Sequence, residues 1–523
     1  MRSLPSFAQI LIGLCLGLGI CPGVSAQAPQ QQGPPEQAEL VAARNISDVS
    51  ARLKELKRIK EAYPQSTVSY TIDLAILATA SLNTDSLDGL LAAQMEAIGS
   101  SKIQDRFWLL LDSTDVLLSH PKTSEFSMPE VLKAIQDNKV KALTILANPD
   151  NLTSVPQKFS YTIPASYKDM FEVSIARAQL QCGDGQAAIA TLEKHGEHSR
   201  GTAYYFALGE AYLDQKRDNE ALEAFLQVAA ESNPAATEKA REIYVKLNGN
   251  EAGFEAEIEK LRETRPFSPP PFSAPENWKG KTVLAEVFTG SECPPCVSAG
   301  FGYDALKDYY STQYLAVLKY HLPIPRYDPM MNPATQKRQD YYAVRSTPTA
   351  IIDGVKSVPA GGYRTASFDT FFRAKNEIDP LLSGTPLVTI RASATIDSDK
   401  VTVDCEFSNI VEGADYHVVL AQTEEEFKGY NGIKSHKMVV RDIETVPPGG
   451  SASVTFDLPE SEKLADTHIS DWGKTAPQTR ITGSKWPQKN NKISRSNLKA
   501  VVFIQDRESK QVHNALVVDV KTR

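Results

Sequence analysis

The sequence predicts a multidomain protein with three parts: an all-α helical repeat region, an α/β domain and an all-β sandwich. Three observations predict this order. Apolar residues recur at three- and four-residue steps over residues 41–264, a strand–helix–strand pattern follows over 278–380, and apolar and polar residues alternate with a period of two over 386–523. A chain of 523 residues is also too long for a single hydrophobic core.

The composition is ordinary for a globular protein and limits the classes of partner. Hydrophobic residues make up 41% of the chain and charged residues 23%. The formal net charge is -8, and the sequence contains no basic stripe interleaved with aromatic residues. Because binding to nucleic acid needs a basic face, we expect no nucleic-acid partner.

Residues 1–26 have the features of a secretory signal peptide. Arg2 supplies a basic start, an apolar centre runs to about Cys21, and small residues at 24–26 form a cleavage site. The apolar centre is shorter than the roughly 20 residues that a membrane-spanning helix needs. We therefore expect an exported protein, located in the periplasm or outside the cell.

The next part of the chain is a linker followed by helices. Residues 27–40 are rich in glutamine and proline and are expected to be disordered. Within the helical region, residues 169–235 contain two similar copies of a helix pair, in which Ala188 and Ala221 occupy equivalent positions. The second copy resembles a tetratricopeptide repeat, which implies a surface that docks a peptide or a protein. A spacer or dimerisation arm without a specific ligand is the alternative.

A proline-rich stretch separates the helices from the α/β part. Residues 265–277 are expected to be a stiff, extended linker, because proline favours that geometry and ends the last helix. Strands are expected at 281–288 and 314–321, with a helix between them that begins at Cys296. The α/β part therefore starts with a strand–helix–strand unit.

The pattern of the last part of the chain predicts strands. Alternation with turn residues between the runs is typical of an antiparallel β-sandwich of the immunoglobulin-like kind, over residues 386–523. The polar stretch at about 465–494 interrupts this pattern. We expect it to be a long insertion in the sandwich.

Two cysteines, Cys293 and Cys296, directly follow the first expected strand and bracket two prolines. A C-x-x-C pair at a helix N-terminus has a physical reason to be reactive, because partial positive charge and unpaired N–H groups stabilise a thiolate there. The first cysteine would face solvent and attack, and the second would resolve the mixed disulfide. The only other cysteines after the signal peptide are Cys182 and Cys405, which is too few for a disulfide scaffold.

Three other roles for the pair stay open. Structural zinc needs four ligands, and His321 would supply only a third. Copper(I) accepts two or three soft ligands, and His321, Met330 and Met331 would have to help. A permanently closed structural disulfide is the third role, and the solvent-facing position expected of Cys293 weighs against it.

Residues 278–380 resemble the thioredoxin fold, on the order strand–CPPC–helix and on the stretch "STPT" at 346–349. The resemblance implies that the peptide bond between Thr347 and Pro348 is cis and lies against the cysteine pair. It also implies that Thr347 pairs with extended substrate backbone, and that Pro348 keeps metals away from the cysteines. No dissociable cofactor is needed, because the disulfide itself carries the electrons.

Two positions depart from the pattern of the thioredoxin family. Glu292 precedes the first cysteine where tryptophan is usual, and a carboxylate beside a thiol raises the pKa of that thiol. Val287 stands where the family has a buried acid, and Glu286 is displaced by one residue, to the opposite face of the strand. Further candidates to modulate or line the site are His321, Arg326 and Asp328.

Together these residues predict an exported thiol–disulfide oxidoreductase that acts on protein cysteines. Because Pro294 and Pro295 offer no N–H to a thiolate of Cys293, a reductant or mild exchanger is favoured over a strong oxidant. Its expected partners are a protein thiol or disulfide client, an upstream thiol reductant and a protein docked on the helices. The alternative is a non-catalytic envelope scaffold that binds through its repeats and sandwich, and copper(I) handling is third.

Overall fold

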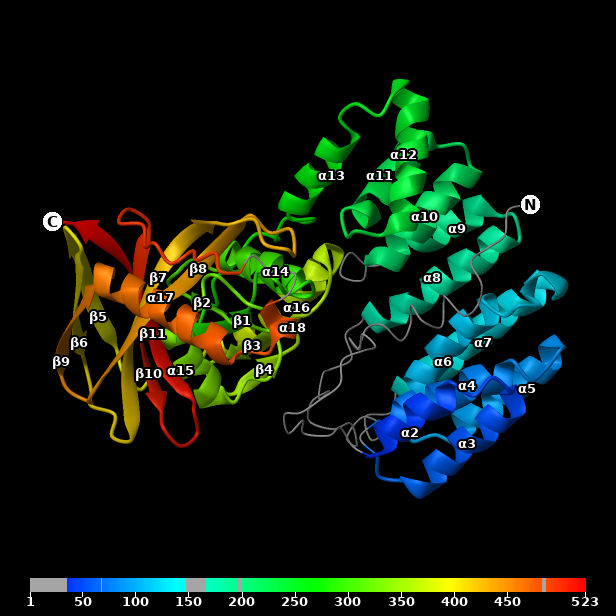
Figure 1. The fold of residues 1–523 in the computed structure, drawn as a ribbon, viewed down its shortest axis with the longest axis horizontal. Helices are drawn as coiled ribbons and strands as arrows, with labels where there is room; N and C mark the ends of the chain where they lie inside the picture. The colour runs from blue at the N-terminus through cyan, green and yellow to red at the C-terminus, as the bar shows by residue number, and fades with distance from the viewer. Residues whose placement is uncertain (1–34, 67, 147–165, 195–199, 482–485) are drawn as a thin grey trace. The chain divides into compact units, whose positions relative to one another are not determined.

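The computed structural model describes residues 35–66, 68–146, 166–194, 200–481 and 486–523 (Figure 1). The expected signal peptide lies outside the described residues. The chain divides into a helical unit, residues 1–196 with 207–221, and a sheet unit, residues 197–206 with 222–523. Among the described residues, no helix is both long enough and apolar enough to cross a membrane.

The helical unit is built from helices that pack on their neighbours in chain order. They bury a core to which Leu56, Ile76, Phe107 and Phe171 contribute. Their bounds are α2 (Pro35–Arg44), α3 (Val49–Ala62), α4 (Ser69–Ser81), α5 (Leu87–Gly99), α6 (Ile103–Leu118), α7 (Met128–Leu146), α8 (Ser166–Gln181) and α9 (Gly185–Glu193).

The predicted disordered linker is wrong at its end, because residues 35–40 belong to α2. Pro35 opens this helix, at a position where its missing N–H costs nothing. Leu40 is only 3% exposed and packs into the core of the helical unit. Residues 27–34 lie outside the part of the chain that is described.

The repeated helix pairs are confirmed. The first copy is α8 with α9, and the second comprises α10 (Thr202–Asp214) and α11 (Asp218–Ala229). The equivalent residues Ala188 and Ala221 are both fully buried, as small residues are where two helices approach closely. Two further helices follow, α12 (Pro234–Asn248) and α13 (Phe254–Glu263).

The sheet unit contains one mixed sheet of eleven strands among the described residues, in the order β4-β3-β1-β2-β8-β7-β10-β11-β5-β6-β9. The strands are β1 (Val283–Thr289), β2 (Leu315–His321), β3 (Thr349–Ile352), β4 (Lys356–Val358), β5 (Ile390–Asp397), β6 (Lys400–Phe407), β7 (Ala414–Glu426), β8 (Ser435–Val446), β9 (Ser451–Asp457), β10 (Leu498–Asp506) and β11 (Val512–Thr522). A helical region followed by strands is therefore confirmed.

The α/β part and the expected sandwich share one sheet. Strand β2 pairs with β8 through Lys319 and Val439. Along β7, Val418 and Leu420 enter one hydrophobic core while Val419 and Ala421 enter another. A strand that is apolar on both faces must be covered on both sides, so β7 is an inner strand and not the half-exposed strand of an isolated sandwich.

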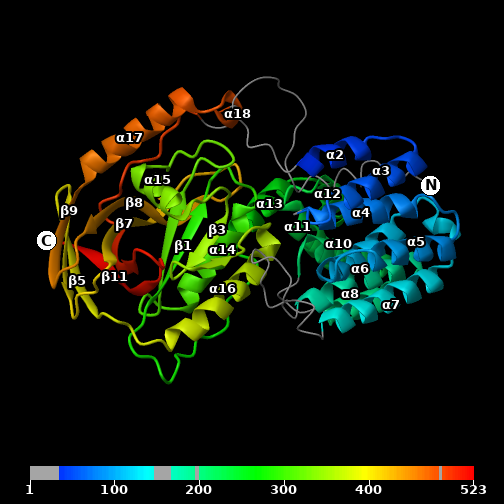
Figure 2. The same ribbon diagram turned by 90° about the horizontal axis from the view of Figure 1, so that it is seen from below.

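Helices cover the α/β end of the sheet on both faces (Figure 2). One face of β1, β2 and β3 packs on α14 (Cys296–Tyr309) and α16 (Ser367–Leu382). The other face packs on α15 (Pro333–Tyr342) and on strands β7, β8, β10 and β11. Strand β1 runs parallel to β2 and antiparallel to β3, which in turn is antiparallel to β4.

The proline-rich residues 265–277 form neither helix nor strand, as expected, but they are docked on the sheet unit. The ring of Phe267 lies 4.6 Å from that of Phe368 on α16. The ring of Phe272 lies 4.9 Å from that of Tyr314. These two aromatic contacts dock the segment on the sheet unit.

The expected insertion at 465–494 is partly a helix, α17 (Leu458–Thr475), followed by the short α18 (Gln478–Ile481). Along α17, Lys463, Asp471 and Lys474 are exposed, while Ile469 is fully buried in a cluster with Tyr327 and Met331. Tyr327 belongs to the loop after β2. Helix α17 therefore supports the loop that reaches the cysteine pair.

Candidate functional site

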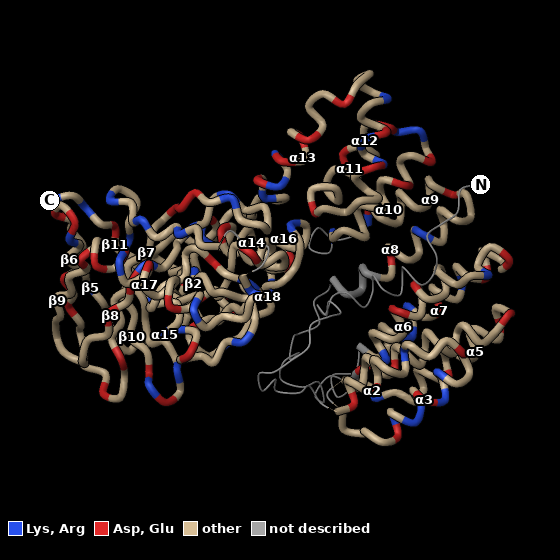
Figure 3. The backbone as a smooth tube through the Cα atoms, viewed as in Figure 1, with Lys and Arg blue, Asp and Glu red and all other residues tan. Residues whose placement is uncertain are grey.

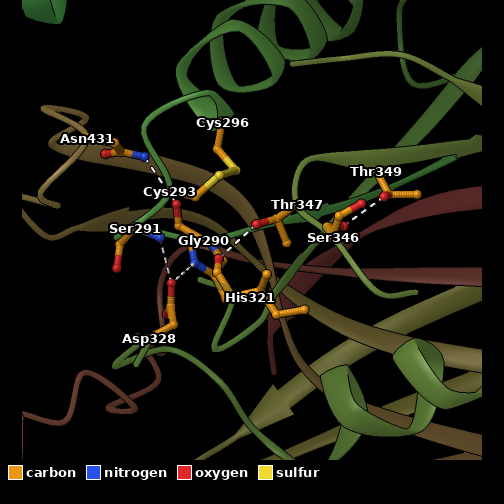
Figure 4. Close-up of a disulfide and its surroundings, with 11 residues drawn as sticks. Gly290, Ser291, Cys293, Cys296, His321, Asp328, Ser346, Thr347, Thr349 and Asn431 are labelled. Carbon is orange, nitrogen blue, oxygen red and sulfur yellow. Dashed lines mark hydrogen bonds and ion pairs between the residues drawn. A yellow bond between two sulfur atoms is a disulfide. The ribbon is translucent and has the colours of Figure 1, made fainter. Parts of the chain in front are cut away.

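A disulfide joins Cys293 and Cys296 across the start of α14, with their Cα atoms 5.3 Å apart (Figure 4). Strand β1 ends at Thr289, just before the turn that carries the cysteine pair. The N–H of Cys293 donates to the carbonyl oxygen of Gly290 at 3.2 Å, which tightens the turn between strand and helix. The pair thus lies on rigid elements.

Both cysteines are fully buried, with 0% of either side chain exposed. Only Pro294 and Pro295, between them, face solvent. The expectation that the first cysteine projects into solvent is therefore wrong for the disulfide form. Two segments from elsewhere in the sheet unit lie against the turn that carries Cys293.

The first covering segment is the loop of residues 322–332, which follows β2. A side chain on Gly290 would meet its backbone, since a Cβ atom there would lie 3.1 Å from the carbonyl oxygen of Leu322. The Ser291 N–H donates to Oδ2 of Asp328 at 2.6 Å. Asp328 is fully buried, and this bond ties the loop to the turn before the cysteines.

The second covering segment is residues 427–434, between β7 and β8, which we call the hairpin tip. The N–H of Asn431 donates to the carbonyl of Ser291 at 3.1 Å, and its side-chain amide donates to that of Gly290 at 3.2 Å. The Arg326 guanidinium lies over the ring of Tyr430, 5.4 Å from its centre. The loop of residues 322–332 and the hairpin tip therefore contact each other beside the turn that carries Cys293.

The predicted substrate-binding residues lie at the same site. The bond between Thr347 and Pro348 is cis, and both residues are half-buried. The Thr347 hydroxyl donates to the carbonyl of Ile324 in the covering loop at 2.8 Å. A Cβ atom on Gly361 would be 3.6 Å from the Pro348 ring and 3.8 Å from Pro295, so both prolines flank this glycine.

The N–H groups that open α14 are already occupied. Those of Cys296 and Val297 donate to the carbonyls of Cys293 and Pro294 at 3.1 and 3.4 Å. That of Ser298 donates to the carbonyl of Gly362 at 3.2 Å. A thiolate on Cys293 consequently finds fewer free donors than a helix N-terminus normally offers.

The candidate acid Glu286 lies away from the cysteine pair. Its carboxylate accepts from Arg338 on α15 at 2.9 and 2.7 Å and from the Tyr342 hydroxyl at 2.6 Å. Val287, the next residue, packs on the opposite face with α14. The register along β1 contains no bulge that would turn Glu286 toward the disulfide. Glu292 is 3% exposed, beside Cys293.

His321 belongs to the buried layer beneath the covering loop. Its Nδ1 lies 3.1 Å from Asp328 Oδ2 (Figure 4). The imidazole ring is 5.1 Å from that of His436. Met330 packs with Phe427 in a small apolar cluster, and Met331 packs on α17. In the described ranges no group of three or more His, Cys, Asp or Glu side chains could hold a metal ion.

The other two cysteines differ in accessibility. Cys182 is exposed. Cys405 on β6 is 2% exposed, and burial raises the pKa of its thiol to about 11. Cys405 is therefore inert near neutral pH, whereas Cys182 has to be replaced in any experiment that reads thiol chemistry.

Acidification is expected to destabilise the sheet unit through two buried histidines. Burial lowers the pKa values of His436 and His417 from 6.5 to about 3. The unfolded chain binds these protons below pH 6.5 and the folded chain does not, so stability present above pH 6.5 is lost as the pH falls. Each histidine contributes a loss of about 2 kcal/mol between pH 6.5 and pH 5.

Urea unfolding at pH 7.5 and at pH 5 measures this loss. The variant His417→Gln should lose less between the two pH values than the wild type, even if it is less stable at pH 7.5. An equal loss in both proteins would exclude His417 as a source of the acid sensitivity.

Comparisons with known proteins leave the function open. No family model and no curated protein matches this chain. Two solved structures are similar over 46% of the chain. One is a protein of Agrobacterium tumefaciens, 94% of which is covered at 18% identity with a TM-score of 0.28. The other is HBP35 of Porphyromonas gingivalis, 75% of which is covered at 12% identity with a TM-score of 0.32.

The cysteine pair alone indicates a broad class of function. A close cysteine pair that forms a disulfide at the start of a helix is compatible with a redox function.

Proposed function

We propose that the protein is a thioredoxin-like thiol–disulfide oxidoreductase that acts on protein cysteines. The observation that carries the proposal is the Cys293–Cys296 disulfide at the start of α14, between two parallel strands and next to the Thr347–Pro348 segment. The order β1–α14–β2–α15, then antiparallel β3 and β4, then α16 supports the thioredoxin resemblance. Residues 1–26 favour an exported protein.

In the reducing direction the reaction has two exchange steps. The Cys293 thiolate attacks one sulfur of a client disulfide, which breaks that bond, releases one client thiolate and leaves a mixed disulfide. The Cys296 thiolate then attacks Cys293 Sγ, closes the intramolecular disulfide and releases the second client thiolate. The client gains two electrons from the cysteine pair, and an upstream dithiol protein restores the pair.

The surroundings of the pair favour this direction. The first N–H groups of α14 are bound to carbonyls, Pro294 and Pro295 offer no N–H, and the buried Glu292 is the residue next to Cys293. All three features leave a thiolate poorly stabilised. A pair whose reduced form is poorly stabilised gives up electrons readily, so we propose a reductant or mild exchanger.

The test is to trap a client in a protein whose exposed cysteine is removed. In a Cys182→Ser background, Cys296→Ala should form a disulfide-linked complex that thiol reduction releases. The matched control, Cys293→Ala with Cys296 retained, should trap far less, because Cys293 makes the attack. No trapped client from the reduced Cys296→Ala protein would count against the proposal.

The second candidate is a non-catalytic scaffold in which the disulfide is a structural staple, and the complete burial of both cysteines favours it. In this case reduction of the pair would lower stability, and no client would be trapped. Denaturant unfolding of the oxidised and reduced forms measures the first effect, which should be about 2 kcal/mol or less, because the disulfide closes a very short loop.

A further inference from the structure

An exposed tyrosine lies next to the Thr347–Pro348 segment, although the cysteines of the site are buried. Tyr363 is 55% exposed and directly follows Gly361 and Gly362. The N–H of Gly362 donates to the carbonyl of Pro295 at 2.9 Å, and Gly361 lies between the rings of Pro295 and Pro348. The backbone that carries Tyr363 therefore contacts the exposed proline between the two cysteines.

A second exposed tyrosine lies next to the residues that precede Cys293. Tyr430 is 63% exposed, and it precedes Asn431, whose N–H donates to the carbonyl of Ser291 at 3.1 Å. Among the described residues, Tyr363 and Tyr430 are the only aromatic residues with a largely exposed side chain. Both belong to the surroundings of the cysteine pair. Exposed aromatic side chains are typical of surfaces that bind another polypeptide.

Two arginines without a carboxylate partner belong to the same surface. Acidic and basic residues are interspersed along the sheet unit (Figure 3), and several of its arginines, such as Arg338 and Arg441, pair with carboxylates. Among the described residues no carboxylate pairs with Arg326 or Arg345. The Arg326 guanidinium stacks on Tyr430, and Arg345 is exposed. Both positive charges are therefore available to a partner.

These arginines lie close to the backbone of Thr347. Arg345 is two residues before Thr347 in the chain. Arg326 is two residues after Ile324, whose carbonyl accepts from the Thr347 hydroxyl at 2.8 Å. The backbone N–H and carbonyl of Thr347 have no hydrogen-bond partner within the described ranges. Backbone groups left unpaired in this way pair readily with an extended peptide, and a peptide bound there has both arginines near it.

We propose that Arg326, Arg345, Thr347, Tyr363 and Tyr430 form a client surface, which binds an extended segment of the client with acidic side chains beside its cysteine. The tyrosines supply apolar contact, and the arginines attract carboxylates. The chain as a whole has a net charge of -8, so an acidic client is attracted to this surface and repelled by most of the molecule. The proposal rests on the proposed function and names its class of client.

The experiment compares two short peptides whose single cysteine is joined to pyridine-2-thiol by a disulfide. In the reduced Cys182→Ser protein, the Cys293 thiolate attacks the peptide sulfur, forms a mixed disulfide and releases pyridine-2-thione, whose appearance gives the rate. One peptide has glutamate on both sides of the cysteine and the other has lysine. Each rate is divided by the rate with dithiothreitol, which corrects for the reactivity of the peptide itself. We expect the glutamate peptide to react roughly five- to tenfold faster at an ionic strength of about 0.05 M, where exposed charges are weakly screened.

Substitutions test whether the arginines cause this preference. The double variant Arg326→Gln/Arg345→Gln should react at similar rates with both peptides. Arg391→Gln on β5 is the matched control and should keep the preference, because Arg391 is also exposed and has no carboxylate partner in the part of the chain that is described. Tyr363→Ser should slow both peptides alike, since it removes apolar contact and no charge. Equal rates for the two peptides in the wild type, or an unchanged ratio in the double variant, would overturn the proposal.

A binding measurement separates the client surface from the proposed function. The same peptides with serine in place of cysteine cannot react, and fluorescence anisotropy measures their binding. Tighter binding of the glutamate peptide that the double variant loses, with no thione released from the cysteine peptides, would keep the client surface and reject the oxidoreductase. Release at equal rates from both cysteine peptides would keep the oxidoreductase and reject the acidic client.

Discussion

Replacing Arg338 with methionine is expected to lower the free energy of unfolding of the sheet unit by about 3–5 kcal/mol. The Arg338 side chain is 2% exposed and that of Glu286 is 0% exposed. Without the guanidinium, the Glu286 carboxylate stays inside the protein with only neutral hydrogen-bond partners. The free energy needed to bury an unpaired charge is the source of this large effect.

Two controls isolate that cause. The double variant Glu286→Leu/Arg338→Met removes both charges and should recover most of the lost stability, because apolar residues often replace a buried ion pair at little cost. Arg373→Met breaks the more accessible pair with Asp369 on α16 and should cost about 1 kcal/mol or less. Denaturant unfolding compares all three, and equal losses for Arg338→Met and Arg373→Met would contradict the explanation.

Buried polar contacts also join the α/β part of the sheet unit to strands β10 and β11. Arg338 also donates to Oε1 of Gln505 on β10 at 3.0 Å, and Lys281 pairs with the buried Asp353 and donates to the carbonyl of Val512. These contacts join β1 and α15 to β10 and β11. We therefore expect the sheet unit to unfold in one transition.

The local elements of this unit could be predicted from the sequence. The apolar run that forms β1 and the helix that begins at Cys296 are set by neighbouring residues, and the structure places both there. The pairing of β2 with β8 was missed, because it depends on Lys319 and Val439, which are far apart in the chain. The unbroken apolar run at 418–421 was the available signal, since a half-exposed strand alternates.

The residues of the candidate site were predicted, but their burial was not. The C-x-x-C motif and the STPT stretch can be recognised in the sequence. The structure brings together Cys293, Cys296, Thr347 and Pro348. Their burial was not foreseen, because the residues that lie against their turn come from distant parts of the chain, the loop 322–332 and the hairpin tip 427–434. The sequence signal was the glycines of that segment: a Cβ atom on Gly429 would lie 2.6 Å from the Ser291 carbonyl oxygen, so only glycine permits the approach.

The cysteine pair is expected to have a reduction potential at or below the value of about -270 mV typical of thioredoxin. Potential rises when the protein stabilises the thiolate of the reduced form, and here the stabilising groups are largely absent. The opening N–H groups of α14 are bound to carbonyls, and Pro294 and Pro295 contribute none. Equilibration with a dithiol redox buffer in the Cys182→Ser protein, followed by alkylation, measures the potential.

Substitutions at the exposed Pro295 separate the two sources of thiolate stabilisation. Pro295→Ala adds an N–H alone, while Pro295→Lys adds an N–H and a positive charge next to Cys296. We expect the lysine variant to have the higher potential, by about 30 mV or more over the wild type, which corresponds to ~1.4 kcal/mol for two electrons. A wild-type potential of about -120 mV, typical of strong oxidants, would contradict this prediction. It would mean that the N–H groups of α14 become free to stabilise the thiolate when the disulfide is reduced. The direction of electron flow proposed here would then reverse.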